Sequence, residues 1–89
     1  MVCRIETRRE NDRVVVHLAG RLSDGQVPDL LAACAGSAEP PIVELEELIS
    51  ADSVGIDALL RIEQQGARLV GLPEYLRLKL ETLSRARQR

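Results

Sequence analysis

Short runs of apolar residues in the first half of the chain predict three strands. Residues 2–7 alternate apolar and polar side chains, as in a strand with one exposed face, and residues 13–19 form a β-branched run. The turn-forming triplet Glu10-Asn11-Asp12 joins them and predicts a hairpin. Residues 42–45 follow two prolines that favour extended backbone, so we expect a third strand there.

The segment over residues 52–66 has the clearest helical spacing. Asp52 is suited to cap its first turn, and Gly66 is suited to end it. On a helical wheel the segment separates into an apolar and a polar side. The apolar side holds Gly55, Ile56, Leu59 and Ile62, and the polar side holds Ser53, Asp57, Arg61 and Gln64. Val54 lies with the polar residues, so this apolar side chain is expected to face solvent.

Two further helices and a fourth strand complete the expected order. Pro28 suits the first turn of a short helix that the pattern ends at Gly36. Residues 67–72 predict a short buried strand. The leucines after Pro73 fit a helix or a strand, and the strong helix formers favour a helix. We expect this last helix to cover the sheet through Leu76, Leu80 and Leu83, and residues 84–89 to form a flexible tail.

Strands that alternate with helices after a hairpin imply parallel pairing with right-handed connections. The 89 residues allow one domain. The predicted fold class is therefore α/β over residues 1–89: a small sheet, with an N-terminal hairpin and then parallel strands, on which about three helices pack.

Composition excludes several functions. The net charge of −2 excludes a chain-wide basic field for nucleic acid, and the single aromatic residue, Tyr75, excludes a stacking platform. Cys3 and Cys34 have no metal-ligand spacing, although a single disulfide between them is conceivable. The chain opens without an apolar leader and has no apolar run long enough to span a bilayer. We therefore expect a cytoplasmic protein with no direct membrane insertion.

The sequence contains no constellation typical of an enzyme. It has no Gly-x4-Gly-Lys phosphate loop and no credible Ser/His/Asp set, so we expect a binding protein without a cofactor. His17 is expected to be a packed or surface histidine. Glu44, Glu46 and Glu47 could suggest metal ligands, but adjacent strand positions point to opposite faces, which favours a solvated charge cluster and no metal.

Three segments in order resemble the STAS domain, the fold of bacterial anti-sigma-factor antagonists and of sulfate transporter tails. PIVELEELISADSVGIDALL is similar to its central signature, a hydrophobic strand followed by Asp-Ser-Ser-Gly at a helix start. Upstream, VVVHLAGRLSDGQVPDLL resembles the family's strand, Gly-x-Leu and first helix, with Gly20 and Leu22 in place. Downstream, ARLVGLPEYLRLKLETL resembles the strand, Gly turn and third helix. The resemblance covers residues 10–83.

Two departures from the family pattern matter. In the antagonists a partner kinase phosphorylates the second hydroxyl of Asp-Ser-Ser-Gly, and that position is Val54 here. Ser53, one residue earlier, is either an alternative phosphorylation site or an unmodified serine at a helix start. The family also continues into another strand and helix, so this chain resembles a shortened STAS domain.

The resemblance implies a protein–protein interaction module in a partner-switching system. The partner would be an anti-sigma factor or a related kinase-like protein, bound through the start of the second helix. The expected contact residues are Asp52, Ser53, Val54, Asp57 and Arg61. The residues alone leave Asp52 open between partner contact and helix cap, and Val54 open between interface and ordinary exposed residue.

A second function class is an accessory subunit of an ABC-type phospholipid transport ATPase, because lone STAS subunits also occur in such complexes. In both classes the partner is a protein and not nucleic acid. The strand at 67–72 is expected at the edge of the sheet. It would pair there in a homodimer or with the partner, unless the tail covers it and keeps the chain monomeric.

Overall fold

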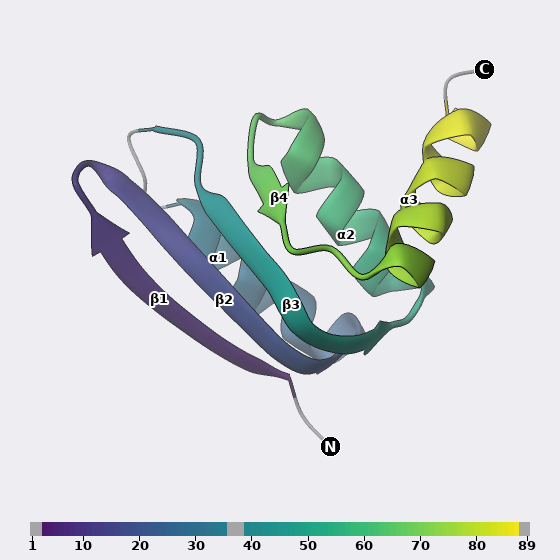
Figure 1. Ribbon diagram of the computed structural model, residues 1–89, viewed down its shortest axis with the longest axis horizontal. Helices are drawn as coiled ribbons and strands as arrows, with labels where there is room; N and C mark the ends of the chain where they lie inside the picture. Colours follow the sequence, from purple (N-terminus) through teal and green to yellow (C-terminus); the bar gives the residue numbers. More distant parts are fainter. Residues whose placement is uncertain (1–2, 36–38, 88–89) are drawn as a thin grey trace.

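The computed structural model describes residues 3–35 and 39–87, which form a mixed sheet and three α-helices (Figure 1). The sheet order is β1-β2-β3-β4, with β1 and β2 antiparallel and the other neighbours parallel. The elements are β1 (Arg4–Glu10), β2 (Arg13–Leu22), the 3-10 turn η1 (Asp24–Gln26), α1 (Val27–Ala35), β3 (Ile42–Ala51), α2 (Ser53–Gln64), β4 (Arg68–Val70) and α3 (Glu74–Arg87). The predicted α/β class, a hairpin followed by parallel strands, is confirmed.

The hairpin closes where the sequence predicts it. Glu10 pairs with Arg13 across the two-residue turn, and Asn11 has a φ of 58°, a left-handed conformation that asparagine tolerates better than most residues. From this turn the β1–β2 ladder continues without a register shift to the pair Arg4–Ala19. β1 is therefore a regular strand along its whole length.

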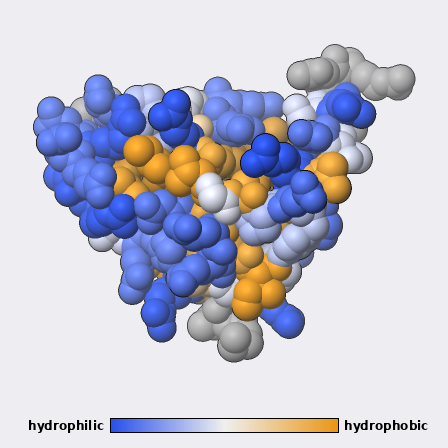
Figure 2. Space-filling model, in the orientation of Figure 1, coloured by the Kyte–Doolittle hydropathy of each residue, from blue (hydrophilic) through white to orange (hydrophobic). Residues whose placement is uncertain are grey.

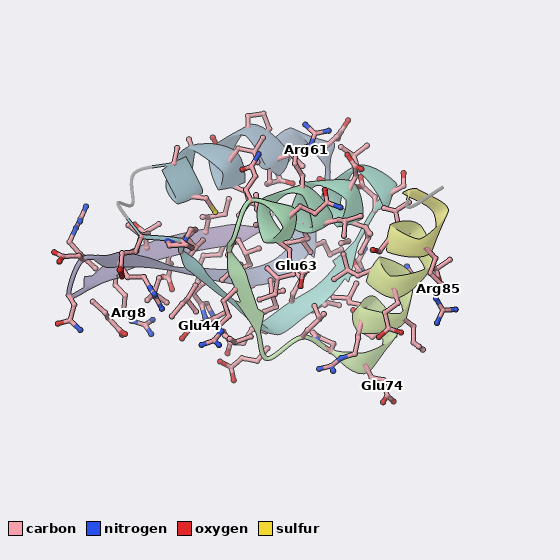
Figure 3. All side chains as sticks on the ribbon, turned by 90° about the horizontal axis from the view of Figure 1, so that it is seen from above. Arg8, Glu44, Arg61, Glu63, Glu74 and Arg85 are labelled. Atoms are coloured by element: carbon pink, nitrogen blue, oxygen red, sulfur yellow. The ribbon has the colours of Figure 1, made fainter. Side chains whose placement is uncertain are left out.

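Helices α1 and α2 cover one face of the sheet, and α3 packs against α2 near the end of β3 (Figures 1 and 3). The core between these layers is aliphatic. Its fully buried members include Val16, Leu18 and Leu22 from β2, Val43 and Leu45 from β3, Leu30 from α1, Leu59 from α2 and Leu76 from α3. Neither Cys3 nor Cys34 forms a disulfide, and burial raises the pKa of both thiols.

β3 is longer than predicted and contains two irregularities. The expected strand stops at residue 45, whereas β3 continues to Ala51. Ten residues of β3, 42–51, lie beside eight residues of β2, 15–22, and the register shifts between His17 and Ala19 and again between Gly20 and Arg21. Each shift is a bulge, in which one extra residue of β3 has no partner of its own on β2.

The C-terminal elements also differ from the prediction. β4 covers only Arg68–Val70 and is partly exposed, where the sequence predicts a buried strand over 67–72. α3 continues to Arg87, so residues 84–87, predicted as a flexible tail, are helical. Residues 88–89 and Gly36, the predicted end of α1, lie outside the described residues. Within the described part of the chain, no helix is both long and apolar enough to cross a bilayer.

Candidate functional site

The start of α2 is fixed at the end of the sheet by a helix cap. The Asp52 side chain accepts a hydrogen bond from the Gly55 amide at 2.7 Å through Oδ1, which satisfies one of the free amides of the first turn. The Asp52 backbone N–H donates to the carbonyl oxygen of Leu22 at 3.0 Å. The predicted cap is confirmed, and it ties the helix start to the last residue of β2.

Gly55 brings α2 into direct contact with β2. A Cβ added at Gly55 would lie 2.9 Å from the Leu22 carbonyl oxygen and 3.0 Å from Leu22 Cγ. The first distance is shorter than real Cβ atoms show and its partner is a backbone oxygen, and the second is tighter than most real contacts, so a residue without a side chain is favoured at this position. The glycine of the Asp-Ser-Val-Gly motif therefore has a packing role that the helical wheel shows only as burial.

The predicted contact residues lie on two sides of α2. Ser53 and Val54 are exposed, and Val54 has 47% of its surface accessible. Asp57 is half-buried and accepts a hydrogen bond from Arg61 at 3.3 Å, one helical turn later. Arg61 is exposed on the helical side of the sheet (Figure 3). It borders a second hollow between the C-terminal ends of α1 and α2.

An open apolar groove of about 780 Å³ runs between the start of α2 and α3. Its lining residues are Ala51, Ser53, Val54, Ile56 and Asp57 on one side and Leu78, Lys79, Thr82 and Leu83 on the other. The groove brings Ser53, Val54 and Asp57 together, whereas Asp52 serves as the cap and Arg61 lies outside the lining. The α2–α3 groove, as we call it below, is the first candidate site.

Sequence reasoning missed the α3 side of this groove. It assigned the leucines of α3 to the sheet, and Leu76 and Leu80 are indeed buried in the core. Leu78, in contrast, is 58% exposed. The sequence held part of the signal, because Leu78 falls off the stripe that Leu76 and Leu80 share and is therefore expected to be exposed. Its position across the groove from Val54 depends on how α2 and α3 pack.

The second candidate region is a charged cluster on the face of the sheet opposite α1 and α2 (Figure 3). Arg8 donates to both oxygens of Glu44, at 3.2 and 2.9 Å, and to Glu10 at 2.7 Å. His17 Nδ1 lies 3.2 Å from Glu44 and its Nε2 lies 2.8 Å from Glu47. On the surface shown in Figure 2, hydrophilic side chains dominate the side where β1 lies, and hydrophobic residues form a band over the neighbouring strands.

The cluster shifts the protonation of its own members. Hydrogen bonds to Glu47 and then Glu44 raise the pKa of His17. Hydrogen bonds from Arg8 and then His17 lower the pKa of Glu44. Both shifts favour the charged forms, so His17 serves as the bridge of an ion-pair network.

The prediction that strand alternation places Glu44 and Glu47 on opposite faces of the sheet is wrong. The bulge between Glu44 and Glu47 places both beside His17, because one extra residue lies between them. One oxygen of Glu46 also lies within 4.8 Å of ligand atoms of His17 and Glu44, a spacing that could hold a metal ion. Arg8 already occupies both oxygens of Glu44, so a cation would have to displace the guanidinium group.

No family model matches the sequence, and no curated protein matches it. Solved structures do match. The antisigma-factor antagonist STAS domain from Rhodobacter sphaeroides is 20% identical with a TM-score of 0.58, covering 78% of this chain and 86% of that one. The anti-sigma factor antagonist SpoIIAA in its unphosphorylated form is 19% identical with a TM-score of 0.55, covering 97% and 98%.

A structure of Mglu is 25% identical with a TM-score of 0.58; the match covers 72% of this chain but only 18% of Mglu. At these identities the matches establish the fold. The described chain has the STAS fold of the anti-sigma-factor antagonists, which confirms the resemblance seen in the sequence.

Proposed function

We propose that this chain is a cytosolic interaction module that binds a regulatory protein through the α2–α3 groove. The observation that carries the proposal is the exposure of Val54 and Leu78 on the two sides of one groove. Exposed apolar side chains that gather in one hollow are typical of surfaces that bind other proteins. The groove includes Ser53, Val54 and Asp57, three of the five residues that the STAS resemblance assigns to partner binding.

The groove suits a partner with an apolar anchor. Ile56, Leu83 and Ala51 give it an apolar floor, and Asp57 and Lys79 add one charge of each sign. This arrangement matches the apolar centre and polar rim of protein interfaces. Because both solved STAS structures described above are named as anti-sigma-factor antagonists, the partner proposed is an anti-sigma factor or a related kinase-like protein.

Val54 keeps this surface permanently unphosphorylated at position 54. A phosphate at this position would add a charge of about −1.5 to −2 to the apolar groove, and valine cannot accept one. The surface is therefore held in the binding-competent, unphosphorylated form. Ser53 remains the candidate for modification, since its side chain is exposed at the first residue of α2 and lines the same groove.

The test replaces the two exposed anchors and compares them with a matched control. Val54→Asp and Leu78→Asp should each weaken partner binding at least tenfold in calorimetry, with unchanged circular dichroism. Tyr75→Asp is the control: Tyr75 is also the second residue of a helix and is 44% exposed, but it lies outside the groove lining. Equal affinity for Val54→Asp and the unaltered chain would refute the proposal.

The identity of the captured partner decides between the two function classes. A kinase-like protein supports the partner-switching proposal, and an ABC ATPase subunit supports the transport alternative. In either class the chain binds without catalysis, so purified protein should not hydrolyse ATP or GTP above a buffer control. Hydrolysis that follows the chain through purification and is lost in a point variant would overturn this part.

A further inference from the structure

Strand β1 forms one edge of the sheet and is open along its length. No described element lies beyond it in Figure 1. It has seven residues, contains no proline or glycine, and pairs with β2 without a bulge. Every second residue of such an edge directs its N–H and C=O groups outward, where another strand can pair with them. The opposite edge, β4, offers only three residues.

The side chains of β1 carry a self-complementary charge pattern. Along the face that also bears His17, the residues are Arg4, Glu6, Arg8 and Glu10. Reversing this row exchanges every positive charge for a negative one. We propose that β1 pairs with β1 of a second copy of this chain, antiparallel and centred on Thr7, so that two four-stranded sheets become one continuous sheet of eight strands.

Centring on Thr7 sets every outer charge opposite its complement. Arg4 faces Glu10 of the second copy, and Glu6 faces its Arg8; the two-fold axis repeats both pairs. Opposite charges in directly opposed positions stabilise a strand pair. Thr7 meets Thr7 at the axis, and the stem of Arg9 lies beside Ile5.

Neighbouring registers are excluded by the same charges. A two-fold axis between antiparallel strands keeps side chains on their own face, so the axis can move only to the next residue along the strand. An axis at Glu6 sets Arg4 opposite Arg8 and Glu6 opposite itself. An axis at Arg8 sets Arg8 opposite itself and Glu6 opposite Glu10. Like charges in these positions destabilise the pair. Axes at Ile5 or Arg9 also oppose unlike charges, but each pairs only two of the four charged positions, so the axis at Thr7 is the one register that pairs them all.

Two of these charges have no ion-pair partner within the described chain. Arg8 and Glu10 pair with each other, but Arg4 and Glu6 take part in none of the ion pairs among residues 3–35 and 39–87. In the proposed dimer both gain one. Glu6 would join Arg8 of the second copy and extend the network that already links Arg8 to Glu44.

Two single substitutions and their mixture test the proposal by sedimentation equilibrium. The unaltered chain should approach twice its 9.8 kDa mass at hundreds of micromolar. Glu6→Arg places only arginines in the 6–8 pairs, and Arg8→Glu places only glutamates there, so each variant alone should dimerise at least tenfold more weakly. Mixing the two variants restores opposite charges in both pairs, and a heterodimer should form.

The controls keep this test decisive. Glu63→Arg reverses an exposed charge on α2 and should leave the dimer unchanged. Arg4→Glu and Glu10→Arg form a second complementary pair, to be used if loss of the Arg8–Glu44 contact impairs folding by circular dichroism. A monomer at hundreds of micromolar, a dimer that survives both reversals, or a mixture that stays monomeric would each overturn the proposal.

Discussion

The charged cluster on the open sheet face and the α2–α3 groove differ in one respect. The side chains of the cluster already have partners within the chain, whereas apolar side chains of the groove are exposed to water. In the cluster, Arg8, His17 and Glu44 hold one another at 2.9 to 3.2 Å. In the groove, Val54 and Leu78 expose about half of their surfaces to water. A partner gains free energy by covering exposed apolar area, whereas it would have to compete with ion pairs that are already formed. The groove is therefore the surface better suited to binding.

The largest effect is expected from a residue that anchors α3 in the core. Leu76 is fully buried, so Leu76→Ala should lower the free energy of unfolding by about 3 kcal/mol through lost burial and a residual cavity. Leu78→Ala, half a turn away on the same helix, should change it by less than about 0.5 kcal/mol because Leu78 is exposed. Urea unfolding measures both. Similar losses for the two variants would mean that the groove side of α3 is packed and not open.

A smaller effect is expected at the helix cap, where structural and binding roles can be separated. Asp52→Ala removes the acceptor for the Gly55 amide and should cost about 1 kcal/mol of unfolding free energy. Asp52→Asn keeps an acceptor oxygen and should retain most of the stability. If Asn preserves both stability and partner affinity, the cap is the whole role of Asp52. Weaker binding by the stable Asn variant would instead assign Asp52 to the interface.

The charged cluster should give the smallest effect, with a defined pH dependence. The pKa of His17 is raised on folding, so its contribution to stability is complete below its unfolded pKa, near 6.5, and is lost as the pH rises through the folded pKa. The pKa of Glu44 is lowered, so its contribution is present above its unfolded pKa, near 4.5, and is lost as the pH falls through the folded value. The cluster is most stabilising between these two values.

The urea midpoint between pH 5.5 and pH 8.5 measures the histidine part. The unaltered chain should lose at most about 1 kcal/mol over this range through His17, and His17→Gln should lose less. Added salt should reduce the difference, because the network is partly exposed to solvent. A pH dependence that persists unchanged in His17→Gln would place its origin in another group.

The contrast between the two regions also explains what the sequence could predict. The cap and the exposure of Val54 follow from positions within one helix, and both were predicted. The α3 side of the groove depends on how two helices pack, which local spacing does not determine.

The extent of β3 was missed for a different reason. Its buried residues Val43, Leu45, Leu48 and Ala51 are separated by two, three and three positions, a spacing that resembles a helix more than a strand. If Glu46 and Ile49 are left out when the residues of β3 are counted, buried and outward-facing residues alternate strictly. These two positions coincide with the two register shifts against β2, which only the paired structure can reveal.

The bulges of β3 have a consequence for how this chain can change in length during evolution. In a regular strand, deletion of one residue turns every later side chain to the opposite face. In β3, deletion of Glu46 or Ile49 would remove a residue that has no partner on β2 and leave the remaining side chains on their present faces. Gly71 approaches the bulge at Glu46 so closely that an added Cβ would lie 3.0 Å from Glu46 Cβ, whereas Ile49 is 56% exposed. Position 49 is thus where a central strand of this sheet can lose a residue without disturbing its core.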